Sequence, residues 1–374
     1  MPDYRLFSWG ANSHGQLGLG DFNKDELTIA EEVCLTSVNL KVEHVKKIVG
    51  GAGHTLLLDK FGGVYSCGWN DKGQTGLKNA TSRFQKLDGF DGERIVDVAC
   101  GWDSSMAVTD NGDCFVWGSN TYGQLGLNSI TIGTKIEKPL KLKLNSAVKG
   151  ISMGLRHSAF ITRDSRLFVS GAATKGQLGI NVHGVRFSDS FSEVSDLQPV
   201  KHVSCGQHYT AVITATNEVF AWGDNKYGQL GIDPSLHKRT LRPIKIENID
   251  GCNKIYCGWT HSIILTNDKK VLCWGRNSYG QLGRSKSTST TEFWKPKAAL
   301  ASITINQLSV GSEHNIALAD DGSILSWGWN EHGNCGNGST NDIFVPTKVN
   351  VPNGSAVMVG AGAGHSFAII KTDH

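Results

Sequence analysis

The sequence repeats one stretch of ten residues, written out in full at Trp274-Gly275-Arg276-Asn277-Ser278-Tyr279-Gly280-Gln281-Leu282-Gly283. The pattern Trp-Gly-x-Asn-x-x-Gly-Gln-Leu-Gly is also intact at Trp9–Gly18, Trp117–Gly126 and Trp222–Gly231, and weaker copies lie at Cys67–Gly76, Ser170–Gly179 and Trp327–Gly336. No copy carries an insertion, and successive copies begin 58, 50, 53, 52, 52 and 53 residues apart, a mean of 53. A fixed period of this length indicates a repeat array.

A second pattern, Gly-x-x-His, runs in phase with the first. Its glycines are residues 51, 101, 154, 206, 258, 311 and 362. The His position holds His54, His157, His261, His314 and His365, with Tyr209 in the fourth copy and either Asp103 or Ser104 in the second. Because the seven copies of each pattern fill the chain, we expect one domain over residues 1–374.

The segments between the two patterns predict β-hairpins. Residues 261–275 give an apolar strand, a polar turn and a second apolar strand, and residues 105–118 and 314–328 do the same. No segment sustains a 3.6-residue period that would indicate a helix. About four short strands in each repeat are typical of a propeller blade, so the expected fold class is all-β.

The two ends of the chain predict how the ring closes. The chain opens on the second strand of a hairpin, residues 4–10, and closes on the first strand, residues 365–371. We therefore expect a closed seven-bladed β-propeller whose last blade is shared by both termini. Closure of this kind leaves no open sheet edge.

The composition excludes several classes of protein. There are 45 glycines among 374 residues, about 12% against a usual 7%, which indicates many tight turns. With 37 Lys and Arg against 34 Asp and Glu, the formal charge of +3 gives no overall field for a nucleic acid or an anionic membrane. No apolar run approaches the length of a membrane helix, and the first residues lack the pattern of a secretion signal. We expect no nucleic-acid partner, no membrane insertion and an intracellular location with reduced cysteines.

The residues shared by all repeats are interpreted as scaffold. The Trp position is expected on an inner strand, packed between blades, and the histidines are expected to be buried and bonded to a neighbouring turn. Cys100, Cys205 and Cys257 share the position before the motif glycine and are interpreted as core residues. The spacing brings no set of converging metal ligands together, and no catalytic or phosphate-binding motif occurs. The sequence therefore predicts no metal, no cofactor and no enzyme.

Function is expected where the repeats differ. The most variable positions inside the fixed frame are the two residues between the motif glycine and the His position, namely Ala52-Gly53, Trp102-Asp103, Leu155-Arg156, Gln207-His208, Trp259-Thr260, Ser312-Glu313 and Ala363-Gly364. These pairs lie at one end of equivalent strands and are expected to form one exposed face of the disc, suited to binding a protein. Two longer connections, residues 181–199 and 284–296, are further candidates for binding or regulation. Phe191 and Trp294 are the residues in them that would favour such a role over a surface insertion without function.

The two alternating patterns resemble the regulator of chromosome condensation 1 family over residues 4–371. In the founding member of that family a small GTPase docks on the face that carries the variable pairs. The resemblance thus implies partner-binding roles for Trp102, Asp103, Arg156, Gln207, His208, Trp259 and Glu313. The tryptophans would supply anchor area, and Asp103 or Glu313 would pair with a basic group of the GTPase. Two features of the founder are not seen, namely a wedge inserted within one repeat and a basic N-terminal tail.

The resemblance is strongest to a branch of exchange factors that acts in secretion, on Cys100–Asp103, Gly154–His157, Gly258–His261, Gly311–Asn315 and Ser326–Gly333. It implies a monomeric cytoplasmic and nuclear regulator of a Ran-, Rab-, Ral- or Rho-like GTPase, with an exocyst component as a further partner. One alternative is a protein-interaction scaffold of the same fold without exchange activity. Another is an ultraviolet-B light sensor, because a photoreceptor of the family carries Trp and Arg in these pairs. Here Trp102 and Trp259 lie three blades apart, and neither has an Arg beside it.

Overall fold

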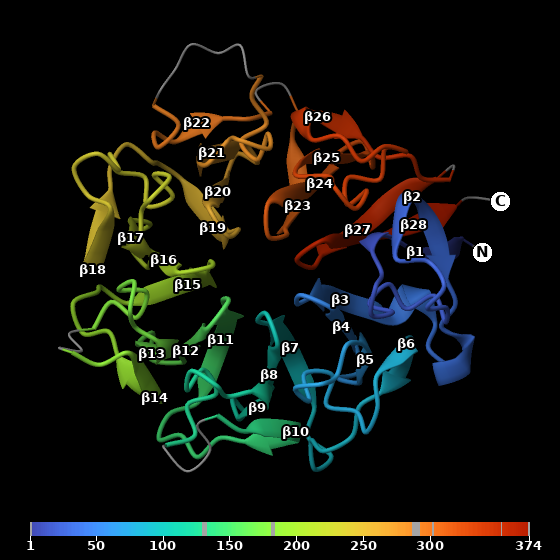
Figure 1. Cartoon of the computed structure of the whole chain (residues 1–374), viewed down its shortest axis with the longest axis horizontal. Coiled ribbons are helices and arrows are strands. Elements are labelled where there is room, and N and C mark those ends of the chain that lie inside the picture. The colour runs from blue at the N-terminus through green and yellow to red at the C-terminus, as the bar shows by residue number, and fades with distance from the viewer. Residues whose placement is uncertain are drawn as a thin grey trace.

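Seven separate four-stranded antiparallel sheets stand around one axis (Figure 1). The computed structural model describes residues 2–128, 133–180, 184–285, 292–300, 303–352 and 354–372. The ring confirms the predicted all-β, seven-bladed propeller. Within the described residues the helical elements are two 3₁₀ turns, η1 (Thr36–Val38) and η2 (Val42–His44), and no helix is long and apolar enough to cross a membrane.

The strands form four concentric sets, which Figure 1 shows from the axis outward. The innermost set is β3 (Val45–Gly50), β7 (Ile95–Cys100), β11 (Val148–Met153), β15 (Val200–Cys205), β19 (Cys252–Cys257), β23 (Ile305–Val310) and β27 (Ser355–Ala361). The second set is β4 (His54–Asp59), β8 (Ser104–Thr109), β12 (His157–Thr162), β16 (Tyr209–Thr214), β20 (His261–Thr266), β24 (His314–Ala319) and β28 (His365–Thr372). The third set is β5 (Val64–Gly68), β9 (Cys114–Ser119), β13 (Leu167–Ala172), β17 (Val219–Asp224), β21 (Val271–Gly275), β25 (Ile324–Gly328) and β1 (Asp3–Ala11). The outermost set is β6 (Thr81–Lys86), β10 (Lys135–Lys141), β14 (Phe187–Glu193), β18 (Arg239–Ile246), β22 (Lys297–Ala298), β26 (Ile343–Lys348) and β2 (Glu26–Val33).

The last blade joins the two ends of the chain, as the sequence predicts. Its strand order is β2-β1-β28-β27, so the first strand of the chain pairs with the last. The register runs without a break from Asp3 opposite Thr372 to Gly10 opposite His365. Each terminus therefore contributes two strands to one sheet, and the ring has no open blade.

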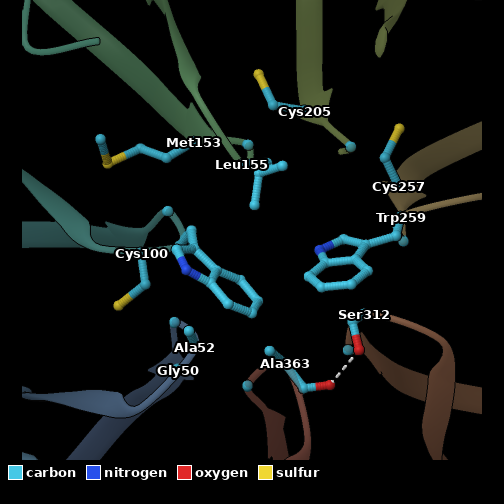
Figure 2. Close-up of a pocket in the computed structure, with 18 of the residues that line it drawn as sticks. Gly50, Ala52, Cys100, Met153, Leu155, Cys205, Cys257, Trp259, Ser312 and Ala363 are labelled. Carbon is cyan, nitrogen blue, oxygen red and sulfur yellow. Dashed lines mark hydrogen bonds between the residues drawn. The ribbon is translucent and has the colours of Figure 1, made fainter. Parts of the chain in front are cut away.

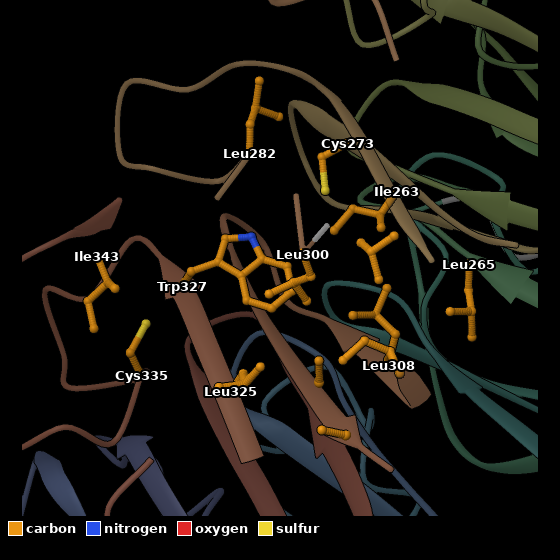
Figure 3. Close-up of a cluster of buried hydrophobic side chains, with 14 residues drawn as sticks. Ile263, Leu265, Cys273, Leu282, Leu300, Leu308, Leu325, Trp327, Cys335 and Ile343 are labelled. Carbon is orange, nitrogen blue, oxygen red and sulfur yellow. The ribbon is translucent and has the colours of Figure 1, made fainter. Parts of the chain in front are cut away.

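The apolar cores lie between neighbouring blades. One of them joins Ile263 and Cys273 of one blade to Leu308, Leu325 and Trp327 of the next (Figure 3). Strands of the second set are buried along both faces because a blade packs on each side. This explains why they read as continuous apolar runs in the sequence rather than as alternating ones.

The repeated tryptophans join each blade to the one before it. Trp9, Trp117, Trp222, Trp274 and Trp327 have no exposed surface. Each indole N–H donates to a backbone carbonyl of the preceding blade, as in the 2.9 Å bond from Trp117 Nε1 to Gln74 O. Packing between blades agrees with the prediction, but the inner-strand position is wrong. These residues lie on the third strand from the axis, because one further strand precedes each hairpin.

The first long connection contains a strand. Within residues 181–199, β14 pairs with β13 as the outer edge of its blade, and residues 181–183 lie outside the described residues. Phe191 belongs to this strand and packs on Phe160, with ring centroids 4.6 Å apart. The interpretation of this segment as a projecting loop is therefore wrong, and Phe191 is a packing residue.

The second long connection is described only in part. Residues 286–291 of the stretch 284–296 lie outside the described residues. Trp294 lies against the backbone turn at Gly228, where a side chain on the glycine would meet its Cβ at 2.3 Å. This contact accounts for the position of Trp294 within the fold.

Candidate functional site

A channel along the propeller axis links three cavities. Pairs of variable residues follow the innermost strands and surround one mouth of this channel, which we call the aromatic mouth. Its cavity has a volume of about 540 Å³ and is lined by Trp69, Trp102, Trp259, Tyr279 and Trp329, among others. A narrower space of about 80 Å³ lies below the tryptophan pair, and a third cavity opens toward the opposite face.

Trp102 and Trp259 lie against each other at the channel, and Figure 2 shows the ring of Trp259 pointing inward from its blade. Their ring centroids are 5.1 Å apart, and the ring planes are inclined by 42°. The two residues stand three blades apart, which is almost diametrically opposite in a ring of seven, so both side chains reach the axis. Both residues line the aromatic mouth and the narrow space below it. From the sequence, a separation of three blades suggested that the two rings lie far apart, so their contact was not predicted.

Two tryptophans of the aromatic mouth were not predicted as site residues. Trp69 and Trp329 occupy the position directly after the first glycine of the ten-residue motif, where other copies carry Ala, Ser, Asp or Arg. This position varies inside a fixed frame just as the predicted pairs do. The same criterion, applied to the first motif as well as the second, would have found both residues.

Glu313 lies on the floor of the aromatic mouth and is only 6% exposed. Thr260 Oγ1 donates to its carboxylate oxygens at 2.7 and 2.8 Å, and Gln281 Nε2 donates at 2.7 Å. His261 Nδ1 is 3.7 Å from the same group. The expectation of an exposed carboxylate is therefore wrong for this residue, because polar groups from three strands or loops enclose it.

Arg156 and His208 form a second group beside the aromatic mouth. They line a separate cavity of about 400 Å³, where the exposed Arg156 guanidinium lies 4.3 Å from the centre of the Tyr122 ring. Burial lowers the pKa of His208 from its ordinary value. Asp103 is half-buried, and the same effect raises the pKa of its carboxyl. Gln207 is half-buried as well.

The predicted site residues therefore occupy one face but not one pocket. Trp102, Trp259 and Glu313 come together at the aromatic mouth, whereas Arg156 and His208 line the neighbouring cavity. A face of this kind, with large aromatic side chains surrounded by polar groups, is suited to binding a protein surface.

The repeated histidines form a buried chain of hydrogen bonds from blade to blade. His54 Nε2 lies 2.9 Å from Ser105 Oγ of the next blade, and His365 Nε2 lies 2.9 Å from Thr55 Oγ1 across the closure of the ring. The partner is thus a side chain of the neighbouring strand and not a turn, which corrects the expectation. Ser104 holds the His position in the second copy, because it pairs with Gly118 as His54 pairs with Gly68.

Burial keeps four of these histidines neutral at neutral pH. It lowers the pKa of His54, His157, His314 and His365 from 6.5 to about 3. The described residues contain no group of three or more His, Cys, Asp or Glu side chains arranged to hold a metal ion.

Cys100, Cys205 and Cys257 line the narrow part of the channel and also pack in the apolar cores between blades, as the sequence predicts. Each thiol is directed toward a carbonyl of the preceding blade, as from Cys257 Sγ to Ser204 O at 3.4 Å. Burial raises the pKa of all three thiols to about 12, so they are protonated at neutral pH. Protonated thiols are poor nucleophiles and poor metal ligands.

Comparisons with known proteins agree on the architecture. A family model described as RCC1-like domain matches residues 5–368. The secretion-regulating guanine nucleotide exchange factor of Bos taurus is 34% identical over 397 residues, covering 98% of this chain and 83% of the relative. The ultraviolet-B receptor UVR8 of Arabidopsis thaliana is 29% identical, covering 92% and 79%. Yeast RCC1 (Prp20), solved in complex with Kap60, superposes with a TM-score of 0.89 at 23% identity, covering 100% of this chain and 90% of that one.

Proposed function

Because the chain belongs to the RCC1-like domain family, we propose that it regulates a small GTPase by promoting exchange of the bound guanine nucleotide. The observation that carries the proposal is its 34% identity, over nearly its full length, to a relative named as a guanine nucleotide exchange factor. The yeast neighbour, Prp20p of Saccharomyces cerevisiae, is itself characterised by its binding to Gsp1p and histones.

We place the GTPase on the face of the aromatic mouth. An exchange factor accelerates release by binding the nucleotide-free GTPase more tightly than the loaded one, and this needs no acid–base pair. Trp102, Trp259, Trp69 and Trp329 provide the large, rigid side chains that anchor protein interfaces. Arg156 and Asp103 lie around this centre with charged groups that would orient the partner.

The buried Glu313 supports a more specific contact. Its carboxylate accepts only neutral donors in hydrogen bonds among the described residues, and it lies at the bottom of a cavity with aromatic walls. Aromatic faces and a carboxylate together favour a cation. We propose that a Lys or Arg side chain of the GTPase enters this cavity, with Glu313 rather than an exposed acid as its counter-ion.

The finer assignments are extended from the resemblance to exchange factors that act in secretion. The name of the Bos taurus relative supports a role in secretion. We extend this to an exocyst component as a second partner, to a Ran-, Rab-, Ral- or Rho-like GTPase, and to a location in cytoplasm and nucleus. These assignments define which partners to test first.

A scaffold without exchange activity is the second candidate function, and the regular repeat supports it. All seven copies of the ten-residue motif have the same length. Each copy closes on the same backbone bond, for example from Gly15 N to Asn12 O at 2.9 Å and from Gly333 N to Asn330 O at 2.9 Å. No copy therefore carries a wedge to displace a nucleotide-binding loop.

A nucleotide-release assay separates the two candidates. The purified protein is added to a panel of Ran, Rab, Ral and Rho GTPases loaded with a fluorescent nucleotide, and release is followed over time. An exchange factor accelerates release from one of them by several orders of magnitude and binds the empty GTPase most tightly. A scaffold leaves every release rate unchanged and shows no preference for the empty form.

A further inference from the structure

The mouth of the channel opposite the tryptophan pair is rich in lysine, and we call it the lysine mouth. Its cavity has a volume of about 620 Å³ and is enclosed by the innermost strands. Lys46, Lys47, Lys149, Lys201 and Lys254 line it, and Asp97 is the one acidic residue among its lining residues. The formal charge of the whole chain is only +3, so this concentration of ammonium groups is local.

A β-bulge in every innermost strand creates this arrangement. The register shifts between Val45 and Lys47, between Val200 and His202, between Cys252 and Lys254, and at the equivalent place in the other four blades. A bulge leaves one residue unpaired and redirects the side chains beside it. Four of the unpaired residues line the lysine mouth, and three of these are Lys46, Lys149 and Lys201.

Most of these lysines lack a carboxylate partner. Lys47 pairs with Asp97 at 2.7 Å. Lys46 and Lys149 donate only to neutral oxygens, Val96 O at 2.7 Å and Ser165 Oγ at 2.6 Å. Within the described part of the chain, Lys254 has no hydrogen-bond or ion-pair partner. Together with Lys201, four positive charges are therefore left without a neutralising group at this mouth.

His202 adds an unused polar atom to the same wall. Its Nδ1 is buried and has no hydrogen-bond partner in the described structure. Burial lowers the pKa of its imidazole to about 4, and the charges of Lys254 and Lys47 contribute to this lowering. The charged groups that face this imidazole are Lys47, Lys201 and Lys254, and Asp97 opposes them.

We propose that the lysine mouth binds a compact anion that carries several phosphate groups, of the inositol polyphosphate type. Lysines of four blades line this one cavity, with Lys149 and Lys201 donating to Ser165 Oγ and Asn217 Oδ1 at its outer side, and an enclosed cavity of this size fits a small multiply charged group rather than an extended chain. Beyond it, Trp102 and Trp259 lie against each other at the other end of the channel. Ammonium groups serve as point-charge donors to phosphate oxygens, which have no preferred direction to satisfy.

Isothermal titration calorimetry with inositol hexakisphosphate tests this site on the full chain. The test variant is Lys201→Gln/Lys254→Gln, and the matched control is Lys138→Gln/Lys143→Gln, which removes the same charge from exposed positions on and beside the outer strand β10. We expect the test variant to weaken binding about tenfold or more and the control to change it less than about twofold, because close charge pairs dominate over distant screened ones. All four lysines are exposed, so both variants should melt as the wild type does.

Two further readouts locate the ligand. Binding should raise the pKa of His202, followed by the pH dependence of its imidazole resonances, because a bound anion favours the imidazolium. Vesicles of phosphatidylcholine with or without phosphatidylinositol bisphosphate show the source of the phosphates. Binding to these vesicles identifies a lipid head group, and binding to the soluble probe alone identifies a free inositol phosphate.

Three results would overturn the site. The first is the absence of binding to either probe at low ionic strength. The second is equal weakening in the test variant and the control, which would indicate attraction by the general charge of the surface. The third is displacement of the probe by an acidic peptide at equal concentration, which would show that the mouth accepts any anionic chain.

Discussion

The two mouths of the channel use the same seven innermost strands, yet one gathers indole rings and the other gathers ammonium groups. At the aromatic mouth Trp102 and Trp259 come from loops that follow innermost strands, while Trp69 and Trp329 follow strands of the third set. At the lysine mouth the side chains come from bulges near the starts of the innermost strands. Between them runs a buried frame of histidines and tryptophans that is nearly the same in every blade. The comparison shows that the residues common to all blades hold the ring together. The residues that differ between blades determine which side chains line each mouth.

Removing the closing strand should have the largest effect, because both mouths depend on the ring. A protein lacking residues 1–18 loses β1 with the fully buried Leu6 and Trp9, loses the buried Leu17 of the following turn, and exposes an edge of β28. We expect it to lose stability on the scale of the entire free energy of unfolding, about 5–15 kcal/mol. Calorimetry should then show no cooperative transition. A melt like that of the full chain would mean that the two termini do not close the ring.

The second-largest effect should come from lowering the pH, which should reduce the free energy of unfolding of the ring. The pKa of His54, His157, His314 and His365 is about 3 in the folded state, against an ordinary value of 6.5. Between these values the unfolded chain binds more protons, so the free energy of unfolding falls as the pH is lowered below 6.5. Each histidine contributes about 1.4 kcal/mol per pH unit, or roughly 5 kcal/mol for the four at one unit below 6.5.

Urea titrations between pH 7.5 and 5 measure this loss. The slope of unfolding free energy against pH should correspond to the uptake of several protons, and His314→Asn should reduce it by about one proton. A slope near zero would show that the imidazoles are accessible to protons in the folded ring.

Trp274 and Trp259 belong to the same blade, but Trp274 lies in the buried frame and Trp259 at the aromatic mouth. Substituting each one compares how much the frame and the mouth contribute to stability. Trp274→Ala removes a fully buried side chain and its bond to Gln229 O, so we expect a loss of about 3–5 kcal/mol in unfolding free energy. Trp259→Ala, at the aromatic mouth, should lose less than about 1.5 kcal/mol because the side chain is half-exposed. Denaturant unfolding of both variants tests the division. Equal losses would mean that the Trp102–Trp259 contact belongs to the frame.

The smallest expected effect concerns the one incomplete place in the histidine chain. Ser104 is too short to reach the next blade, and its Oγ is buried without a partner among the described residues. In other blades the imidazole packs against the motif glycine, and a Cβ on Gly51 would meet His54 Cε1 at 2.2 Å. Gly101 is the equivalent glycine here, so the space for an imidazole is kept. Ser104→His should therefore bond to Ser158 and stabilise the protein by about 1 kcal/mol, read from its urea midpoint. A destabilised variant would show that this blade lacks room for the ring.

The sequence predicted the ring, its closure and the face of the variable pairs, because period and phase are properties of the chain order alone. It did not predict which of those residues meet. The contact of Trp102 with Trp259 depends on their opposite places around seven blades, and the burial of Glu313 depends on donors from Thr260 and Gln281. The lysine mouth was missed because a bulge, which one sequence does not reveal, turns lysines of separate strands toward one cavity.

The claim that the aromatic mouth acts on a GTPase is tested most directly by the release assay with one variant from each mouth. The fluorescent nucleotide is released from the responsive GTPase in the presence of wild type, Trp102→Ala/Trp259→Ala or Lys201→Gln/Lys254→Gln. We predict that wild type and the lysine variant accelerate release equally, while the tryptophan variant loses about 2–4 kcal/mol of complex stability and with it most of the acceleration. Full acceleration by a folded tryptophan variant, together with its loss in the lysine variant, would contradict the account.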